Sequence, residues 1–381
     1  MTRRTLLSTA ASSALLAADA AKPRLGLDLF SLRSQGWDAF QFLDYAAKHK
    51  VQTIHYSEIR FIGSLEDDHL KKVKAKADEH GIQIELGMRS ICPTSKFFDP
   101  KQGTAERQLL KMVRAARIAG SQIVRCFLGM AADRETGEID KHIENTVKVL
   151  KAVRSPVRDA GLMIAVENHG GDMQARELKT LVEAAGKDFV GVCLDSGNPL
   201  WAIEDPHLTL ETLAPYVLTS HVRDTVLWRT PEGAAVQWTR MGDGNIDIAG
   251  YLEKFVKLCP GKAISLEIIM TGPRIYPFHT PKFWDAYKNM PAWEFSRFLA
   301  LADRGTARPV EPPVSKERAI VKEREDLEAS EVGNDPEVGG YRRPRREQDL
   351  RSARPCRDAR ASAHSRRQAG EAGPATVRVT P

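Results

Sequence analysis

The sequence predicts a (β/α)8 TIM barrel, and three observations support this fold class. Eight short apolar runs alternate with stretches of helical periodicity between residues 24 and 302, as a barrel of eight strand–helix units requires. Such runs, bounded by Gly and Asn, are typical of parallel strands covered on both faces. The last four runs each end on a carboxylate or an imidazole. A doubly wound open sheet is the alternative, but no Gly-x-Gly-x-x-Gly follows an early strand.

The first four strand–helix units follow one another along the chain. Strands are expected at 25–30, 53–58, 82–87 and 123–128, and helices over 37–49, 66–80, 104–119 and 139–160. Apolar residues recur three and four positions apart in the helical stretches, which forms a stripe that can cover a sheet. Gly81 directly follows the second helix, at the position where glycine commonly ends a helix.

The next four units begin with a complete β-α-β segment over 164–195. Strands are expected at 164–167, 190–195, 216–221 and 263–267, and helices over 174–186, 208–213, 248–258 and 292–301. The first of these helices has one apolar face and a stop at Gly186. A long loop that carries Trp228 and Trp238 is expected between the last two strands.

Four consecutive strand ends carry potential metal ligands. They are Glu167, Asp195, His221 and Glu267. In a barrel, the carboxyl ends of all strands lie at one face, and active sites are found at this face. Buried carboxylates are costly unless they are paired or bind a cation, so the set predicts a metal site, with a structural salt network as the alternative. One nitrogen among oxygen ligands favours Mn²⁺, with Mg²⁺ or Co²⁺ as the other candidates.

Three further polar residues are predicted to serve this site. His169 stands two residues beyond Glu167, so strand alternation points both to the same side, for contact with substrate or with the ligands. Arg223 stands two residues beyond His221 and is a candidate partner for a substrate carboxylate or hydroxyl. Arg125 lies in a predicted strand, where we expect it to neutralise a site carboxylate, with substrate binding as the alternative.

Residues 1–21 have the order of a twin-arginine signal peptide. Arg3 and Arg4 precede an Ala/Ser/Leu run, and small residues near its end form an Ala-x-Ala site with cleavage expected after Ala20. The apolar run is too short to span a bilayer. We therefore expect a periplasmic or exported protein with no membrane partner; a frayed N-terminal helix is the alternative.

The predicted barrel occupies residues 22–306, and two segments follow it. Residues 307–330 are expected to form a linker and a C-terminal helix, and residues 331–381 an Arg-rich, disordered tail. The stretch 340–381 has eleven Arg and four acidic residues, and such sequence cannot bury enough apolar surface to fold. The net charge of +6 belongs to this tail, so the near-neutral barrel gives no indication of nucleic-acid binding.

Five motifs follow the predicted strand ends in order. They are Val-Glu-Asn-His-Gly-Gly-Asp (166–172), Cys-Leu-Asp-Ser-Gly-Asn (193–198), Ser-His-Val-Arg-Asp (220–224), Gly-Asp-Gly-Asn-Ile-Asp (242–247) and Ser-Leu-Glu (265–267). Together they resemble the xylose isomerase-like TIM-barrel superfamily and, within it, the sugar phosphate isomerase/epimerase group. The resemblance covers about residues 24–302 and is fairly specific for fold and metal site, but poor for substrate.

The resemblance implies roles for particular residues. The four strand-end residues would be the metal ligands, and Glu167 and Glu267 would also form the acid/base pair. Asn198 departs from the family pattern, since many members carry a histidine at that position, and it joins the predicted substrate-binding residues. The extra histidines of the DNA-repair endonuclease branch have no counterpart at the ends of the third and fourth strands.

The predicted site suits the removal of a proton beside a carbonyl, which needs a carboxylate base and an electrophile on the oxygen. We expect a divalent-metal-dependent isomerase or epimerase that acts through an enediolate on a small-molecule keto-sugar or keto-sugar acid. The alternatives are a lyase that decarboxylates a 3-oxo sugar acid on the same scaffold, and a non-catalytic periplasmic sugar-binding protein. The sequence leaves homo-oligomerisation open.

Overall fold

The computed structural model of the chain describes residues 23–136, 139–309 and 314–331. The predicted signal peptide and the predicted tail beyond Glu331 lie outside these residues. Within the described part, no helix combines the length and the apolar character that crossing a bilayer requires.

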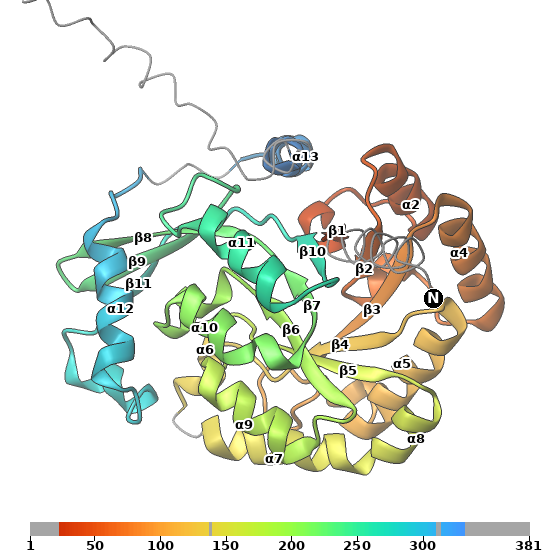
Figure 1. The fold of residues 1–381 in the computed structure, drawn as a ribbon, viewed down its shortest axis with the longest axis horizontal. Coiled ribbons are helices and arrows are strands. Elements are labelled where there is room, and N and C mark those ends of the chain that lie inside the picture. Colours follow the sequence, from red (N-terminus) through yellow and green to blue (C-terminus); the bar gives the residue numbers. More distant parts are fainter. Residues whose placement is uncertain (1–22, 137–138, 310–313, 332–381) are drawn as a thin grey trace, which may run out of the picture. The chain divides into compact units, whose positions relative to one another are not determined.

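Eight parallel strands form one sheet whose two ends meet (Figure 1). Its strands, in chain order, are β1 (Arg24–Asp28), β2 (Thr53–Tyr56), β3 (Gln83–Ser90), β4 (Ile123–Phe127), β5 (Met163–Glu167), β6 (Val190–Asp195), β7 (Val217–His221) and β10 (Ala263–Leu266). Strand β10 pairs with β1, and a parallel bridge between Val222 and Leu266 joins β10 to the end of β7. This arrangement confirms the predicted (β/α)8 barrel.

Helices follow the strands and surround the sheet (Figure 1). They include α2 (Ala39–Lys48), α4 (Asp67–His80), α5 (Ala105–Ala119), α7 (Ile139–Ala152), α9 (Ala175–Ala185), α10 (Pro206–Leu213) and α11 (Ile248–Leu258). Each buries an apolar face; in α9, Leu178, Leu181 and Val182 are fully buried. Two single-turn helices, α3 (Ile59–Ile62) and α6 (Ala131–Arg134), follow β2 and β4.

The single helix predicted over 139–160 is two helices in the structure. Helix α7 ends at Ala152, and α8 (Arg154–Asp159) begins after Val153. Pro156 explains the break, because proline has no N–H to donate to the carbonyl four residues earlier and its ring collides with that carbonyl. The prediction of one continuous helix was therefore wrong at this point.

The region predicted to be a long loop between β7 and β10 contains most of an antiparallel sheet. Strand β8 (Asp224–Thr230) pairs with β9 (Gly233–Thr239), and β9 pairs with β11 (Arg274–Tyr276), which follows β10. Gly233 has φ +155°, and a Cβ there would lie 2.2 Å from the carbonyl oxygen of Tyr276. Helix α12 (Ala292–Asp303) packs beside β8 (Figure 1). This sheet and helix share a second apolar core.

The C-terminal helix α13 (Lys316–Glu331) lies against the chain that follows β1. Glu323 accepts hydrogen bonds from the backbone N–H (3.0 Å) and the Oγ (2.7 Å) of Ser34. Gln35 Nε2 donates to the carbonyl of Ile320 (2.7 Å), and Leu327 is fully buried in the main core. The helix is therefore held mainly by polar contacts around one buried leucine.

We expect Glu323→Ala to lower the free energy of unfolding by about 1 to 3 kcal/mol, because the partly buried donors of Ser34 lose hydrogen bonds to a charged acceptor. Chemical or thermal unfolding measures the change. The matched control is Glu325→Ala on the same helix, whose exposed carboxylate pairs with Arg318 and should contribute much less, because solvent screens an exposed ion pair. Equal stabilities for the two variants would contradict the assigned role of Glu323.

Candidate metal centre and active site

The four predicted ligands converge at the carboxyl end of the barrel. Glu167 ends β5, Asp195 ends β6, His221 ends β7, and Glu267 directly follows β10. One ligand atom from each lies within 4.8 Å of the others, and all four side chains are buried. Strand pairing brings them together: Asp195 and His221 are partners in the register of β6 and β7, and Glu267 N donates to the carbonyl of Val222 (3.0 Å).

The Nδ1 atom of His221 lies between two carboxylates. It is 3.1 Å from Glu167 Oε2 and 3.0 Å from Glu267 Oε2. These two ion-pair contacts lack the geometry of a hydrogen bond to any described residue, whereas most buried polar atoms in proteins are hydrogen-bonded. Carboxylate oxygens and an imidazole nitrogen that face a common point without hydrogen-bonding to one another are arranged as the ligands of a cation would be. Three carboxylates and an imidazole therefore form a plausible centre for a divalent metal ion.

Two buried arginines pair with the carboxylates of this cluster. Arg125 on β4 contacts Glu167. Arg223, two residues after the end of β7, contacts both Asp195 and Glu267. The two guanidinium groups balance part of the negative charge that the sequence analysis assigned to a metal ion alone. The stronger indication of a bound cation is therefore the histidine Nδ1 atom, which faces two carboxylates without an aligned hydrogen bond.

The arginines also set the protonation of the two glutamates. Burial is the largest single influence on the pKa of Glu167 and would raise it, but Arg125 and His221 together outweigh burial and hold this pKa well below the usual value. At Glu267, burial again acts to raise the pKa, and Arg223 together with His221 outweighs it, so the pKa is lowered. At Asp195, by contrast, burial prevails and raises the pKa to about 7. Both glutamates are therefore carboxylates at neutral pH.

Arg223 retains free hydrogen-bonding capacity inside the site. Its Nε and Nη1 atoms have no hydrogen-bond partner among the described residues. Its guanidinium lies over the ring of Trp238 on β9, with Cζ 4.3 Å from the ring centroid, and Trp238 stacks on Trp201 at 4.2 Å. Gly197 leaves room for this side chain, because a Cβ there would lie 2.4 Å from Arg223 Cγ. The arrangement leaves two buried donors for an acceptor-bearing ligand.

Asn198 lies among the ligands, whereas His169 lies beside them. Asn198 donates from Nδ2 to Glu167 Oε1 (3.3 Å), and its backbone N–H donates to Asp195 Oδ1 (2.7 Å). The imidazole of His169 stacks on Phe127, with ring centroids 3.9 Å apart, and its Nδ1 contacts a backbone carbonyl at 2.9 Å. The structure thus places Asn198 nearer the predicted centre than His169.

Two buried residues that contact His221 were missed in the sequence analysis. Asp28 ends β1 and His55 lies on β2, where the two are register partners. His221 Nε2 is 2.7 Å from His55 Nδ1 and 3.2 Å from Asp28 Oδ2. Burial lowers the pKa of His55 to about 3, so its imidazole is neutral. The sequence signal that could have identified these two residues was a carboxylate and an imidazole inside predicted strands that are otherwise mainly apolar.

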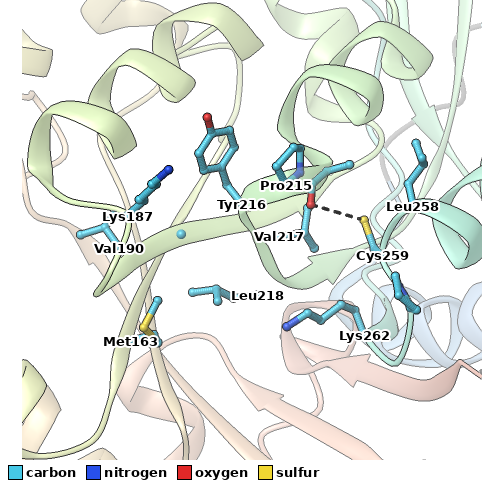
Figure 2. A pocket seen from close by; sticks show the side chains of 13 residues that line it. Met163, Lys187, Val190, Pro215, Tyr216, Val217, Leu218, Leu258, Cys259 and Lys262 are labelled. Atoms are coloured by element: carbon cyan, nitrogen blue, oxygen red, sulfur yellow. Dashed lines mark hydrogen bonds between the residues drawn. The ribbon is translucent and has the colours of Figure 1, made fainter. Parts of the chain in front are cut away.

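An open cavity of about 470 Å³ lies at the opposite end of the barrel (Figure 2). The first residues of β5, β6 and β7 line it, together with Lys187, Tyr216, Cys259 and Lys262. None of the predicted site residues borders this cavity. Since barrel enzymes carry their active sites at the carboxyl ends of the strands, the cavity is separate from the candidate centre.

Comparisons with known proteins agree with the fold. The sequence profile of the family described as xylose isomerase-like TIM barrel matches residues 32–281. The 3-oxo-isoapionate decarboxylase of Pectobacterium atrosepticum is 25% identical over 189 residues, which cover 50% of this chain and 56% of that protein. The match therefore spans about half the length of that relative.

Two solved structures have the same overall fold as this chain. D-psicose 3-epimerase from Clostridium cellulolyticum H10, solved with D-tagatose, has a TM-score of 0.53 at 12% identity. The IOLI protein, solved with a bound zinc atom, has a TM-score of 0.53 at 15% identity. In both cases the alignment covers 81% of this chain and 98% of the other. At these identities the likeness concerns the fold.

Proposed function

The chain belongs to the xylose isomerase-like TIM barrel family, and from this premise we propose that it is a divalent-metal-dependent isomerase or epimerase of a keto-sugar or keto-sugar acid. The observation that carries the proposal is the pair of buried carboxylates, Glu167 and Glu267, that flank one imidazole nitrogen without an aligned hydrogen bond at the carboxyl end of the barrel. The pair supplies two proton-transfer groups within one small site, as enolisation through an enediolate requires.

Glu167, Asp195, His221 and Glu267 would hold the ion, which we propose to be Mn²⁺, with Mg²⁺ and Co²⁺ as alternatives. When bound, such an ion would polarise the substrate carbonyl and stabilise the negative charge that develops on its oxygen. The zinc atom bound by the structurally similar IOLI protein supports the proposal that this chain binds a divalent ion.

The two glutamates would move the proton. Their lowered pKa values keep them deprotonated at neutral pH, which both metal binding and proton abstraction require. One would remove a proton from the carbon beside the carbonyl, and the other would take up a proton from solvent and deliver it to the opposite face. Asn198 and Arg223 would orient the substrate, the latter through its two unpartnered N–H groups. His169 and Arg125 would contact the substrate from the edge of the site.

Decarboxylation of a 3-oxo sugar acid is the second candidate, and two observations favour it. The decarboxylase of P. atrosepticum is a sequence relative. In addition, Arg223 Nε and Nη1 are buried donors without partners, and a guanidinium edge is well suited to a carboxylate. In this reaction the bond to the carboxylate carbon breaks, CO₂ leaves, and one glutamate suffices to pass a proton taken up from solvent to the resulting enediolate.

Turnover of a panel of keto-sugars and 3-oxo sugar acids in D₂O separates the candidates. We expect the Mn²⁺-loaded protein to give a product of unchanged carbon skeleton that carries deuterium at the reacting carbon, because the returned proton exchanges with solvent. Mass spectrometry and NMR measure both properties. Release of CO₂ would identify the lyase instead, and saturable binding without turnover would identify a non-catalytic binding protein. We also propose that residues 1–21 direct export. The protein would then act on its small-molecule substrate outside the cytoplasm.

A further inference from the structure

We propose that Asp28 and His55 are positioning residues that hold the Nε2–H of His221 and thereby aim its Nδ1 lone pair at the metal ion. The inference concerns residues on β1 and β2, which lie outside the four-ligand cluster. It rests on the metal site of the proposed function, but it is independent of whether the enzyme isomerises or decarboxylates its substrate.

The contacts of His221 Nε2 are the first part of the argument. This atom is 2.7 Å from His55 Nδ1 and 3.2 Å from Asp28 Oδ2, and all three side chains have no exposed surface. A carboxylate oxygen can only accept a hydrogen bond, so it would repel a lone pair on Nε2 and favours a proton there. Glu167 and Glu267 favour a proton on Nδ1 in the same way, so a proton on Nε2 makes Nδ1 a ligand when a metal ion takes the place of the proton there.

The second part is that Asp28 is itself held in place. Its Oδ1 accepts hydrogen bonds from the backbone N–H of Phe30 (2.8 Å) and from Ser57 Oγ (3.0 Å). Its Oδ2 makes no hydrogen bond to any described residue but faces the two histidines, at 3.2 Å from His221 and 3.5 Å from His55. The carboxylate is thus anchored at one oxygen and presents the other to the imidazoles.

Asp28→Asn tests this arrangement directly. Phe30 N–H and Ser57 O–H both donate to the Oδ1 position, so the amide oxygen should remain there and the NH₂ group should take the place of Oδ2. The NH₂ group donates rather than accepts. It would therefore favour a lone pair on His221 Nε2 and move the proton to Nδ1, the atom that must bind the ion.

We expect purified, metal-free Asp28→Asn protein to bind Mn²⁺ about 10- to 100-fold more weakly than the unaltered chain, the usual effect of losing the partner of a ligating histidine. Isothermal titration calorimetry measures the affinity. The visible absorption of the Co²⁺-loaded protein should also change, because it reports the ligand geometry. A purely structural role for Asp28 would alter the melting temperature and leave the affinity and the Co²⁺ spectrum unchanged.

Glu85→Gln is the matched control. Glu85 is buried on β3 and accepts a hydrogen bond from Thr219 Oγ1 (2.7 Å). It approaches His55 at 4.0 Å and makes no ion pair or hydrogen bond with His221. The change makes the same carboxylate-to-amide replacement in the same barrel interior, so we expect Mn²⁺ affinity to stay at the level of the unaltered chain.

His55→Gln provides a second test if Asp28→Asn does not fold, and it should likewise weaken Mn²⁺ binding at least tenfold. Folded Asp28→Asn protein with unchanged Mn²⁺ affinity and Co²⁺ spectrum would overturn the inference. So would an equal loss of affinity in Glu85→Gln, or the binding of two ions per chain with Asp28 and His55 as ligands. An unaltered chain that binds no divalent ion would overturn the proposed metal site, and the inference with it.

Discussion

Glu267→Gln should lower turnover by about two to four orders of magnitude even at saturating Mn²⁺, the usual contribution of a positioned proton-transfer group. Glutamine keeps the shape of the side chain and one oxygen for the ion, but it has neither the charge nor the basicity of glutamate. Arg223 would lose one of its two carboxylate partners and keep Asp195, so its position should be retained. Steady-state kinetics over a range of Mn²⁺ concentrations measures the effect.

Two comparison variants make this result interpretable. Glu167→Gln should lose a similar amount of activity if each glutamate serves one face of the reacting carbon. Glu85→Gln, a buried change outside the ligand cluster, should retain turnover close to that of the unaltered enzyme. Recovery of most activity by Glu267→Gln in excess Mn²⁺ would limit Glu267 to metal binding, and normal turnover without excess metal would show that the role is wrongly assigned.

Removal of divalent ions with a chelator should abolish turnover and lower the melting temperature, and Mn²⁺ or Co²⁺ should restore both. At a free Mn²⁺ concentration 100-fold above its dissociation constant, bound ion stabilises the folded state by about 2.7 kcal/mol, which chelation removes. The apo protein should still fold, because Arg125 and Arg223 remain paired with the carboxylates. Differential scanning calorimetry with and without chelator measures the shift.

His221→Gln is the control for the effect of chelation on stability. This variant lacks the nitrogen ligand at the centre of the cluster, so it should bind Mn²⁺ weakly and show little further change in melting temperature with chelator. Full turnover by metal-free, unaltered protein would rule out the metal site. A chelator-induced shift of equal size in His221→Gln would indicate that an ion binds elsewhere.

The barrel and the ends of its strands could be predicted because their signals are local. Each buried parallel strand is a short continuous apolar run, and a polar residue at its end stands out, as Glu167 does after Ile164-Ala-Val. The errors arose where another interaction decided the structure. Pro156 interrupts a helical pattern that otherwise continues, and β9 obtains its second partner from Arg274–Tyr276, beyond the next barrel strand.

The fold class, the four candidate ligands at the strand ends and the chemistry open to their side chains could be read from the sequence, because strand alternation and barrel topology place successive strand ends at one face. The side chains that share the buried interior behind that face could be identified only from the folded chain. Asp28 and His55 become neighbours of His221 through the closure of the sheet between β7, β10 and β1. Such contacts depend on register and ring closure across the whole barrel, which no local pattern encodes.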